Sequence, residues 1–170
     1  MRLDGRRIYL RPMTEKDATD VYTSWLNDPE VNKYLTTKSA TVEELREYIA
    51  KKNMQADTKL FGIFLKENSV HIGTVKLEPI DTPNKKATIG ILIGDKNYWG
   101  KGYAGEAMQL LIKYCFENLH MEEVNLGVLA QNTAAMRAYE KLGFKEAKRE
   151  LGVVHYPNGV FDQVTMVLKK

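Results

Sequence analysis

The chain has 170 residues, and its 44% hydrophobic and 28% charged residues are typical of a folded globular protein rather than a disordered one. A net charge of +3, from 25 basic and 22 acidic residues spread along the chain, argues against a nucleic-acid-binding surface. The sequence has one cysteine, Cys115, no Cys/His cluster with zinc spacing, no signal peptide and no membrane-spanning run. We therefore expect a cytoplasmic single domain over residues 1–170 that needs neither a disulfide nor a metal.

The N-terminal part of the sequence predicts a short strand pair followed by two helices. An Asp-Gly turn signal lies inside the strand-like residues 3–10. Thr14, with an aspartate three residues later, matches a helix N-cap and predicts a helix that continues to about residue 26. Thr41 and Glu44 form a capping-box pattern, which predicts a second helix that ends at about residue 52.

The centre of the chain is rich in strand signals. Residues 60–66 and 70–77 predict a hairpin, and a turn at residues 81–84 leads into the apolar run 88–94. Because this run does not alternate between apolar and polar residues, it is typical of a central strand covered on both faces.

Helices and strands alternate in the rest of the chain. An apolar stripe at helical spacing begins just after Gly102, and it includes Cys115, which we expect to be a buried, unreactive thiol. Residues 124–130 predict a strand, residues 132–142 a helix ended by a glycine, and residues 148–168 a hairpin. Mixed elements without a linker or repeat indicate an α/β or α+β domain.

A glycine-rich loop between the apolar strand and this helix contains Gly100, Gly102 and Gly105. Small residues let the backbone approach a ligand closely, and a helix start presents unpaired N–H groups with a partial positive charge. Strand, glycine loop and helix N-terminus together predict a site for a pyrophosphate group.

The same three glycines also satisfy the G-x-G-x-x-G fingerprint of dinucleotide-binding domains, which is weak by itself. That fingerprint requires a parallel βαβ unit and an acidic residue about 20 positions further on to bind a ribose. The strand 124–130 ends in Gln131-Asn132 instead, and the loop follows three strands that we expect to be antiparallel. A nicotinamide-binding domain is therefore not favoured.

Two motifs resemble those of the GCN5-related N-acetyltransferase superfamily. Trp99-Gly100-Lys101-Gly102-Tyr103-Ala104 resembles its acetyl-CoA loop, Q/R-x-x-G-x-G/A, with Trp99 in place of the usual Gln or Arg. Residues 132–144 resemble its second hallmark, N-x-x-S-x-x-x-Y-E-K-x-G-F, with Ala135 in place of the serine. Residues 8–12 and 25–30 resemble the branch of ribosomal-protein N-terminal acetyltransferases. The resemblance implies an α+β fold with a mixed, mostly antiparallel sheet of about six or seven strands and about four flanking helices.

The resemblance also implies acetyl-CoA as the co-substrate, no metal, and a set of binding residues. The apolar strand would splay from its neighbour and hold the thioester, with the amide of Leu92 or Ile93 at the developing oxyanion. The pyrophosphate would lie on the amides of residues 100–105. The implied cofactor-binding residues are Ile91, Leu92, Ile93, Trp99, Gly100, Lys101, Gly102, Tyr103, Ala104, Gly105, Asn132 and Tyr139.

Tyr139 is the predicted general acid, because a phenol with a pKa near ~10 is still protonated at neutral pH and donates to the departing thiolate. The alternative is a packing tyrosine on an amphipathic helix. Trp25 and Trp99 are expected to pack rather than to line the acceptor site.

The sequence does not identify the general base. Relatives place a glutamate in the central strand, where this chain offers only Thr88. The side chains that could replace this glutamate as the base are Glu78, Asp28, Glu30 and His71. A chain of water molecules is another possibility. We expect His71, in a strand, to face solvent.

The acceptor is predicted as a primary amine on a protein N-terminus, notably of a ribosomal protein. Alternatives are a nucleotide-linked amino sugar or another small-molecule amine, and a non-catalytic acetyl-CoA-binding module. Asp28, Glu30 and Asp162 would attract a cationic amine if they converge. We expect no nucleic-acid or membrane partner, and a monomer or homodimer.

Overall fold

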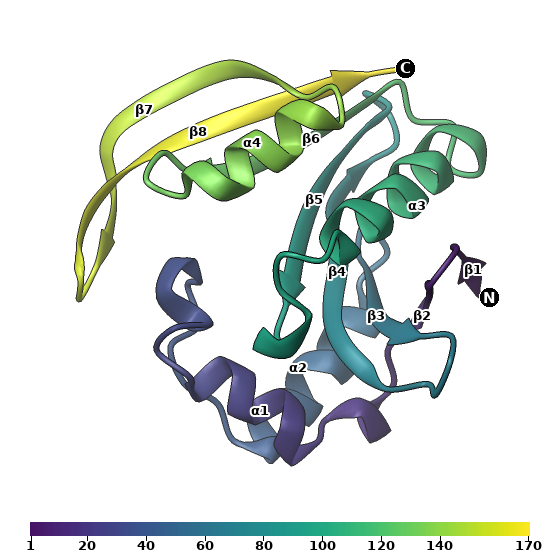
Figure 1. The fold of residues 1–170 in the computed structure, drawn as a ribbon. Coiled ribbons are helices and arrows are strands. Elements are labelled where there is room, and N and C mark those ends of the chain that lie inside the picture. Colours follow the sequence, from purple (N-terminus) through teal and green to yellow (C-terminus); the bar gives the residue numbers. More distant parts are fainter.

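The computed structural model describes residues 1–170, which form one eight-stranded sheet and four α-helices (Figure 1). The strands are β1 (Leu3–Asp4), β2 (Ile8–Pro12), β3 (Lys59–Leu65), β4 (His71–Asp81), β5 (Lys86–Ile93), β6 (Glu123–Leu129), β7 (Lys145–Tyr156) and β8 (Gly159–Lys169). The helices are α1 (Asp20–Asn27), α2 (Val42–Met54), α3 (Tyr103–Glu117) and α4 (Thr133–Lys141).

The strands lie in the order β1-β2-β3-β4-β5-β6-β8-β7, and every neighbouring pair is antiparallel except β5 and β6. The predicted mixed, mostly antiparallel sheet with four helices is therefore confirmed. The sheet has eight strands rather than six or seven, because the N-terminal pair and the C-terminal hairpin both join it. No helix is long and apolar enough to cross a bilayer.

The sheet is covered on both faces. Phe61 of β3 belongs to a hydrophobic cluster with Met108 and Leu111 of α3, whereas the preceding Leu60 belongs to a second cluster with Trp25 of α1 and Ile49 of α2. Because successive side chains of a strand point to opposite faces, α3 covers one face and α1 and α2 cover the other. Leu111 is fully buried, a burial worth roughly 1.5–3 kcal/mol.

The predicted first helix is wrong at its start. Thr14 does begin a helical turn, but only the short 3₁₀ turn Glu15–Asp17. The Asp17 carboxylate accepts two hydrogen bonds from the Arg11 guanidinium, at 2.8 and 2.9 Å, and the chain leaves helical geometry at Ala18. Helix α1 then begins at Asp20, where Thr19 is the N-cap. The capping box of Thr14 and Asp17 is present, so the local signal forms a single turn that does not extend into α1.

The cap of α2 follows the sequence prediction. The Glu44 amide donates to the Thr41 hydroxyl at 3.1 Å, and the Glu44 carboxylate accepts from the Thr41 amide at 3.3 Å. This capping box satisfies two of the N–H groups that a helix start leaves unpaired. The helix continues to Met54, two residues beyond the predicted end.

Candidate active site

The sheet forks between its two parallel strands. β5 and β6 pair at three positions only, Lys86 with Glu123, Ala87 with Val124 and Thr88 with Asn125. Beyond them β5 stays paired with β4 and β6 with β8, so the facing edges of β5 and β6 diverge. The predicted splay is confirmed, and Figure 1 shows β6, β8 and β7 curving away from β5.

A side-chain hydrogen bond closes the apex of the fork. The Thr88 hydroxyl donates to the Asn125 side-chain oxygen at 2.7 Å, at the last paired position of the two strands. Thr88, which stands where relatives have a glutamate, therefore fastens the junction of the strands rather than facing an acceptor.

The open edge of β5 offers two backbone donors. The Gly94 amide donates to the carbonyl of Ile72, at the start of β4, at 2.9 Å. Because alternate amides of a strand point to opposite edges, the Leu92 amide also faces β4, whereas the amides of Ile91 and Ile93 face the fork. Of the two amides predicted at the oxyanion, Ile93 lies on the open edge and Leu92 does not.

The predicted full burial of the apolar strand is wrong for its second half. Ala87 and Ile89 are buried, but Gly90 is exposed and residues 91–93 are half-buried. The run is apolar without being enclosed because Ile91 and Leu92 line an open cavity. An added Cβ at Gly90 would meet no atom within 4 Å, so the backbone there is open to a ligand.

A cavity of about 590 Å³ lies at the mouth of the fork. It brings together Ile91 and Leu92 of β5 with Asn132 and Tyr139 of the α4 segment, four of the predicted site residues. Ile93 and the loop residues 99–105 do not line it. The cavity therefore gathers only part of the predicted site.

Asn132 and Tyr139 are held by α4. The Asn132 side chain caps this helix by accepting from the Ala135 amide at 3.3 Å. One face of Tyr139 packs edge-on against Phe144, with ring centroids 6.1 Å apart. Burial raises the pKa of the Tyr139 phenol, which keeps it protonated at neutral pH, as a proton donor must be.

The glycine loop has the geometry of an anion site. Gly100 and Gly102 have φ values of 68° and 83°, in the left-handed region that glycine adopts without a steric penalty. Gly102 is the N-cap of α3 and has no side chain to accept its first amides, so they point outward unpaired at the positive end of the helix dipole. A Cβ at Gly100 or Gly105 would meet nothing within 4 Å. These residues fit a pyrophosphate group.

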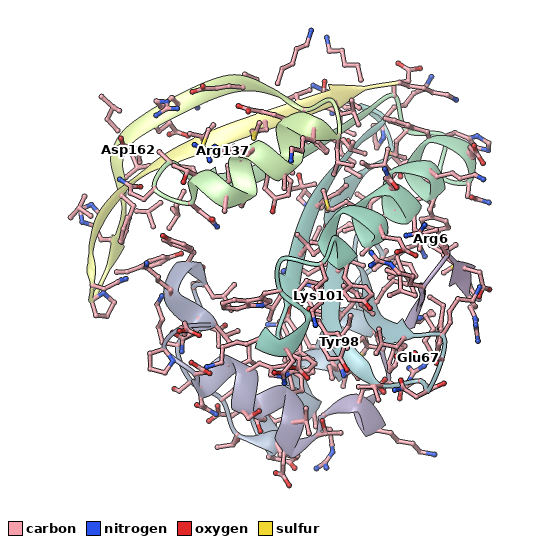
Figure 2. All side chains as sticks on the ribbon, in the orientation of Figure 1. Arg6, Glu67, Tyr98, Lys101, Arg137 and Asp162 are labelled. Atoms are coloured by element: carbon pink, nitrogen blue, oxygen red, sulfur yellow. The ribbon has the colours of Figure 1, made fainter.

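Two aromatic side chains connect this loop to its surroundings. The Trp99 indole donates to the Ile93 carbonyl at 2.6 Å and ties the loop to the open end of β5, although the ring remains 41% exposed. The Lys101 ammonium lies 5.8 Å from the centroid of the Tyr98 ring, and Figure 2 shows both residues in the segment that precedes α3. Trp99 thus has a specific bonding role, which its sequence context did not reveal.

The carboxylates weighed as the general base are bound elsewhere. Glu78 pairs with Lys52 and with Lys76, the latter at 2.7 Å. Asp28 and Glu30 both pair with Lys96, at 2.8 and 3.3 Å. None of these carboxylates lines the cavity.

Asp162 does not join Asp28 and Glu30 in an acidic site. Its carboxylate accepts the Gly152 amide at 2.9 Å within the β7–β8 hairpin, where Figure 2 places it far from Lys101. Asp28 and Glu30 instead bind Lys96, so the predicted convergence of three carboxylates around an amine does not occur.

His71 is enclosed rather than solvent-facing, which corrects the sequence prediction. Its ring stacks on Phe64 at 4.8 Å and meets Trp25 edge-on at 5.0 Å. Burial lowers the pKa of the imidazole to about 4, and the ring nitrogen Nε2 lies 2.8 Å from the Gly73 carbonyl. His71 is absent from the cavity lining, and Trp25 is buried as expected.

Glu44 is the one carboxylate that lines the cavity, although its sequence pattern predicts only a helix cap. The capping box with Thr41 holds the Glu44 side chain at the N-terminal end of α2, beside the cavity. Tyrosine side chains surround the same space: Tyr22, Tyr34, Tyr48, Tyr139 and Tyr156. They come from five separate segments, so no single motif could have indicated their meeting.

A sheet forked between parallel strands, with a glycine loop at a helix N-terminus and a protonated tyrosine in the fork cavity, defines a CoA-dependent acyltransferase. A family model described as an acetyltransferase (GNAT) domain matches residues 7–145. The uncharacterised N-acetyltransferase p20 of Bacillus licheniformis is 36% identical over 144 residues, which cover 82% of this chain and 80% of that protein. The chain belongs to the GNAT acetyltransferase family, and it is an acetyl-CoA-dependent N-acetyltransferase.

Two solved structures from Vibrio cholerae share the fold. A spermidine N-acetyltransferase in complex with CoA and spermine has a TM-score of 0.88 and 22% identity, over 96% of this chain and 95% of that one. A candidate ribosomal-protein-serine acetyltransferase has a TM-score of 0.79 and 19% identity, over 100% and 98% of the chains. At these identities the likeness concerns the fold alone.

Proposed function

We propose that this enzyme acetylates a primary amine that carries a single positive charge, and that the acceptor is the N-terminal amine of a protein. The observation that carries the proposal is the chemistry of the fork cavity, which has one carboxylate, Glu44, among several tyrosines. An ammonium group binds favourably to a carboxylate and to the face of an aromatic ring.

The charges around the cavity argue against the other acceptors. A polyamine carries several ammonium groups, and one carboxylate matches only one of them. A nucleotide-linked amino sugar brings phosphate groups, yet no arginine lines the cavity and its one lysine, Lys76, is paired with Glu78 at 2.7 Å. A protein N-terminus brings one ammonium followed by neutral peptide groups, which suit the hydroxyls of Thr36 and Ser39 and the amide of Gln163.

The ribosomal-protein branch is the second support. Residues 8–12 and 25–30 resemble that branch, and the candidate ribosomal-protein-serine acetyltransferase of Vibrio cholerae matches the whole length of this chain in fold. We propose that the chain is a member of this branch.

Acetyl-CoA supplies the acetyl group as a thioester, and the residues of the fork act on the reacting atoms. The Ile93 amide donates to the carbonyl oxygen as negative charge develops on it. The bound ammonium first loses a proton to water through the open side of the cavity. The neutral amine then attacks and forms the new C–N bond, and the second proton of the nitrogen also passes to water. As the C–S bond breaks, the Tyr139 hydroxyl donates its proton to the thiolate.

The proposal is tested by release of CoA thiol across a panel of amines. The panel contains a peptide with a free N-terminus, the same peptide with a blocked N-terminus and one internal lysine, spermidine, and a nucleotide-linked amino sugar. We expect the free N-terminal peptide to give the highest kcat/KM. A higher value with spermidine or with the amino sugar would contradict the proposed acceptor.

A pair of neighbouring substitutions tests the role of Glu44. Glu44→Gln removes the charge but keeps the capping box, which accepts Glu or Gln at this position. Loss of one charge-assisted contact should raise the KM of the amine about 10-fold, with the KM of acetyl-CoA unchanged. Glu43→Gln, which affects only an exposed pair with Arg46, is the matched control. Equal KM values in both variants would remove Glu44 from the acceptor site.

A further inference from the structure

The first turn of α3 is tied to the N-terminal strands across a wide sequence separation. One carboxylate oxygen of Glu106 accepts the backbone amides of Arg7 and Ile8, at 2.7 and 3.4 Å, and the other accepts the Arg7 Nε at 2.9 Å. The Glu106 side chain is only 14% exposed, so this contact is sheltered from solvent. The start of the helix that follows the glycine loop is thus fixed to the start of β2.

The Arg7 guanidinium continues from Glu106 onto the loop itself. Its Nη1 donates to the Lys101 carbonyl at 2.9 Å, and its Cζ lies 4.2 Å from the centroid of the Tyr103 ring. Its Nη2 would lie 3.4 Å from a Cβ at Gly102. One side chain therefore contacts Lys101 and Tyr103 and lies beside Gly102, in a loop whose glycines have no side chains to hold it in place.

Arg7 also neutralises the negative charge of Glu106, which would otherwise repel the phosphate groups of the donor. Burial raises the pKa of Glu106, but the hydrogen bonds from Arg7 and from two backbone amides lower it by more, so the carboxylate is ionised at neutral pH. A negative charge in the first turn of a helix favours the helix dipole but repels a second anion at the same end. The paired Arg7 removes most of that repulsion.

We propose that Arg7 is a positioning residue for the pyrophosphate of acetyl-CoA. It holds the backbone of residues 101–103 in the geometry that binds an anion, and it neutralises Glu106 behind them. The inference rests on the proposed placement of the pyrophosphate at this loop and is independent of the acceptor. Arg7 acts through the loop and contacts none of the reacting atoms.

The test compares two donors with and without a pyrophosphate, acetyl-CoA and acetylpantetheine. Arg7→Met keeps the aliphatic stem and removes the guanidinium, and Arg6→Met is the control, since Arg6 is exposed and Figure 2 shows it away from Lys101. We expect Arg7→Met to raise the KM of acetyl-CoA about 10-fold, the loss expected for one charge-assisted contact, with kcat nearly unchanged. The kcat/KM of acetylpantetheine should not change.

Two further measurements separate the parts of the proposal. Titration of CoA by calorimetry needs no acceptor, so its result stands even if the proposed acceptor is wrong, and Arg7→Met should weaken binding by the same factor. In the double variant Arg7→Met/Glu106→Gln, the affinity for CoA should recover in part. The repulsion by the Glu106 carboxylate is then gone, but the loop still lacks the hydrogen bond from Arg7 to the Lys101 carbonyl. An equal loss with both donors would indicate a general structural defect and overturn the proposal, as would an unchanged affinity for CoA.

Discussion

Tyr139→Phe is the substitution that most directly tests the proposed chemistry. It removes one hydroxyl from the fork cavity and keeps the ring that packs against Phe144. Because the packing is retained, we expect the free energy of unfolding to change by no more than about 1 kcal/mol. The hydroxyl itself is the proposed proton donor to the thiolate, so its loss should appear in kcat.

The expected loss of rate follows from the role of a general acid. Such a group contributes typically about 10²–10⁴-fold, which corresponds to roughly 3–5 kcal/mol of the barrier. The KM of acetyl-CoA should stay within about twofold, because the pyrophosphate and pantetheine sites are untouched. Burial raises the pKa of Tyr139 above its usual 10.0, so kcat of the wild-type enzyme should show no fall from its deprotonation between about pH 7 and 9.

The assay is thiol release at saturating acetyl-CoA and amine across that pH range. Tyr114→Phe is the matched control, since Tyr114 also packs edge-on against a phenylalanine, Phe61, but lies on α3 outside the cavity. If Tyr139→Phe had the same kcat as the control, or changed only the KM of acetyl-CoA, Tyr139 would be a packing or binding residue and the proposed acid would be refuted.

Three other outcomes follow from the structure. Gly102→Ala should lower the free energy of unfolding by about 1–2 kcal/mol, the cost of a left-handed residue other than glycine, and so lower Tm. Gly105→Ala, in the first turn of α3, should raise the free energy of unfolding by up to about 1 kcal/mol and so raise Tm. Both substitutions should raise the KM of acetyl-CoA if the backbone contacts pyrophosphate. Burial raises the pKa of Glu78 but hydrogen bonds from Lys52 and Lys76 lower it further, below its usual 4.5. Its contribution to stability, roughly 1 kcal/mol, is therefore present above that value and lost as the pH falls through the lowered pKa, and Glu78→Gln should flatten this part of a Tm-against-pH curve. Burial raises the pKa of Cys115 to about 12, so a thiol reagent at pH 8 should detect no thiol in the folded protein and one after unfolding.

Elements with strong local signals could be predicted from the sequence. The capping box at Thr41, the break at Gly102 and the glycine stop at Gly143 each depend on a few neighbouring residues, and the corresponding helices lie within a few residues of their predicted bounds. The first helix was placed too early because Thr14 and Thr19 are both N-cap residues: Thr14 starts only a 3₁₀ turn, and Thr19 starts α1.

The site could be predicted only where a motif is contiguous. The glycine loop and the Asn132–Tyr139 segment each occupy one stretch of sequence. Glu44 and Arg7 were missed because their roles depend on contacts between distant segments, such as Arg7 and Glu106, which are 99 positions apart in the sequence. The ion pairs of Glu78 and Asp28, two of the side chains weighed as the base, could not be foreseen for the same reason, since their lysine partners lie elsewhere in the chain.

The fork has a mechanical consequence. Within the sheet, β6 is joined to β5 by three residue pairs and by the Thr88–Asn125 hydrogen bond. The strands β8 and β7 follow β6 on the far side of the fork. The donor's pantetheine arm, placed between the diverging edges, would add contacts between β5 and β6 where the two strands are no longer paired. Binding of the donor should then make the fork more rigid. CoA should slow the hydrogen exchange of the β6 amides more than that of the β3 amides, because β3 does not border the fork.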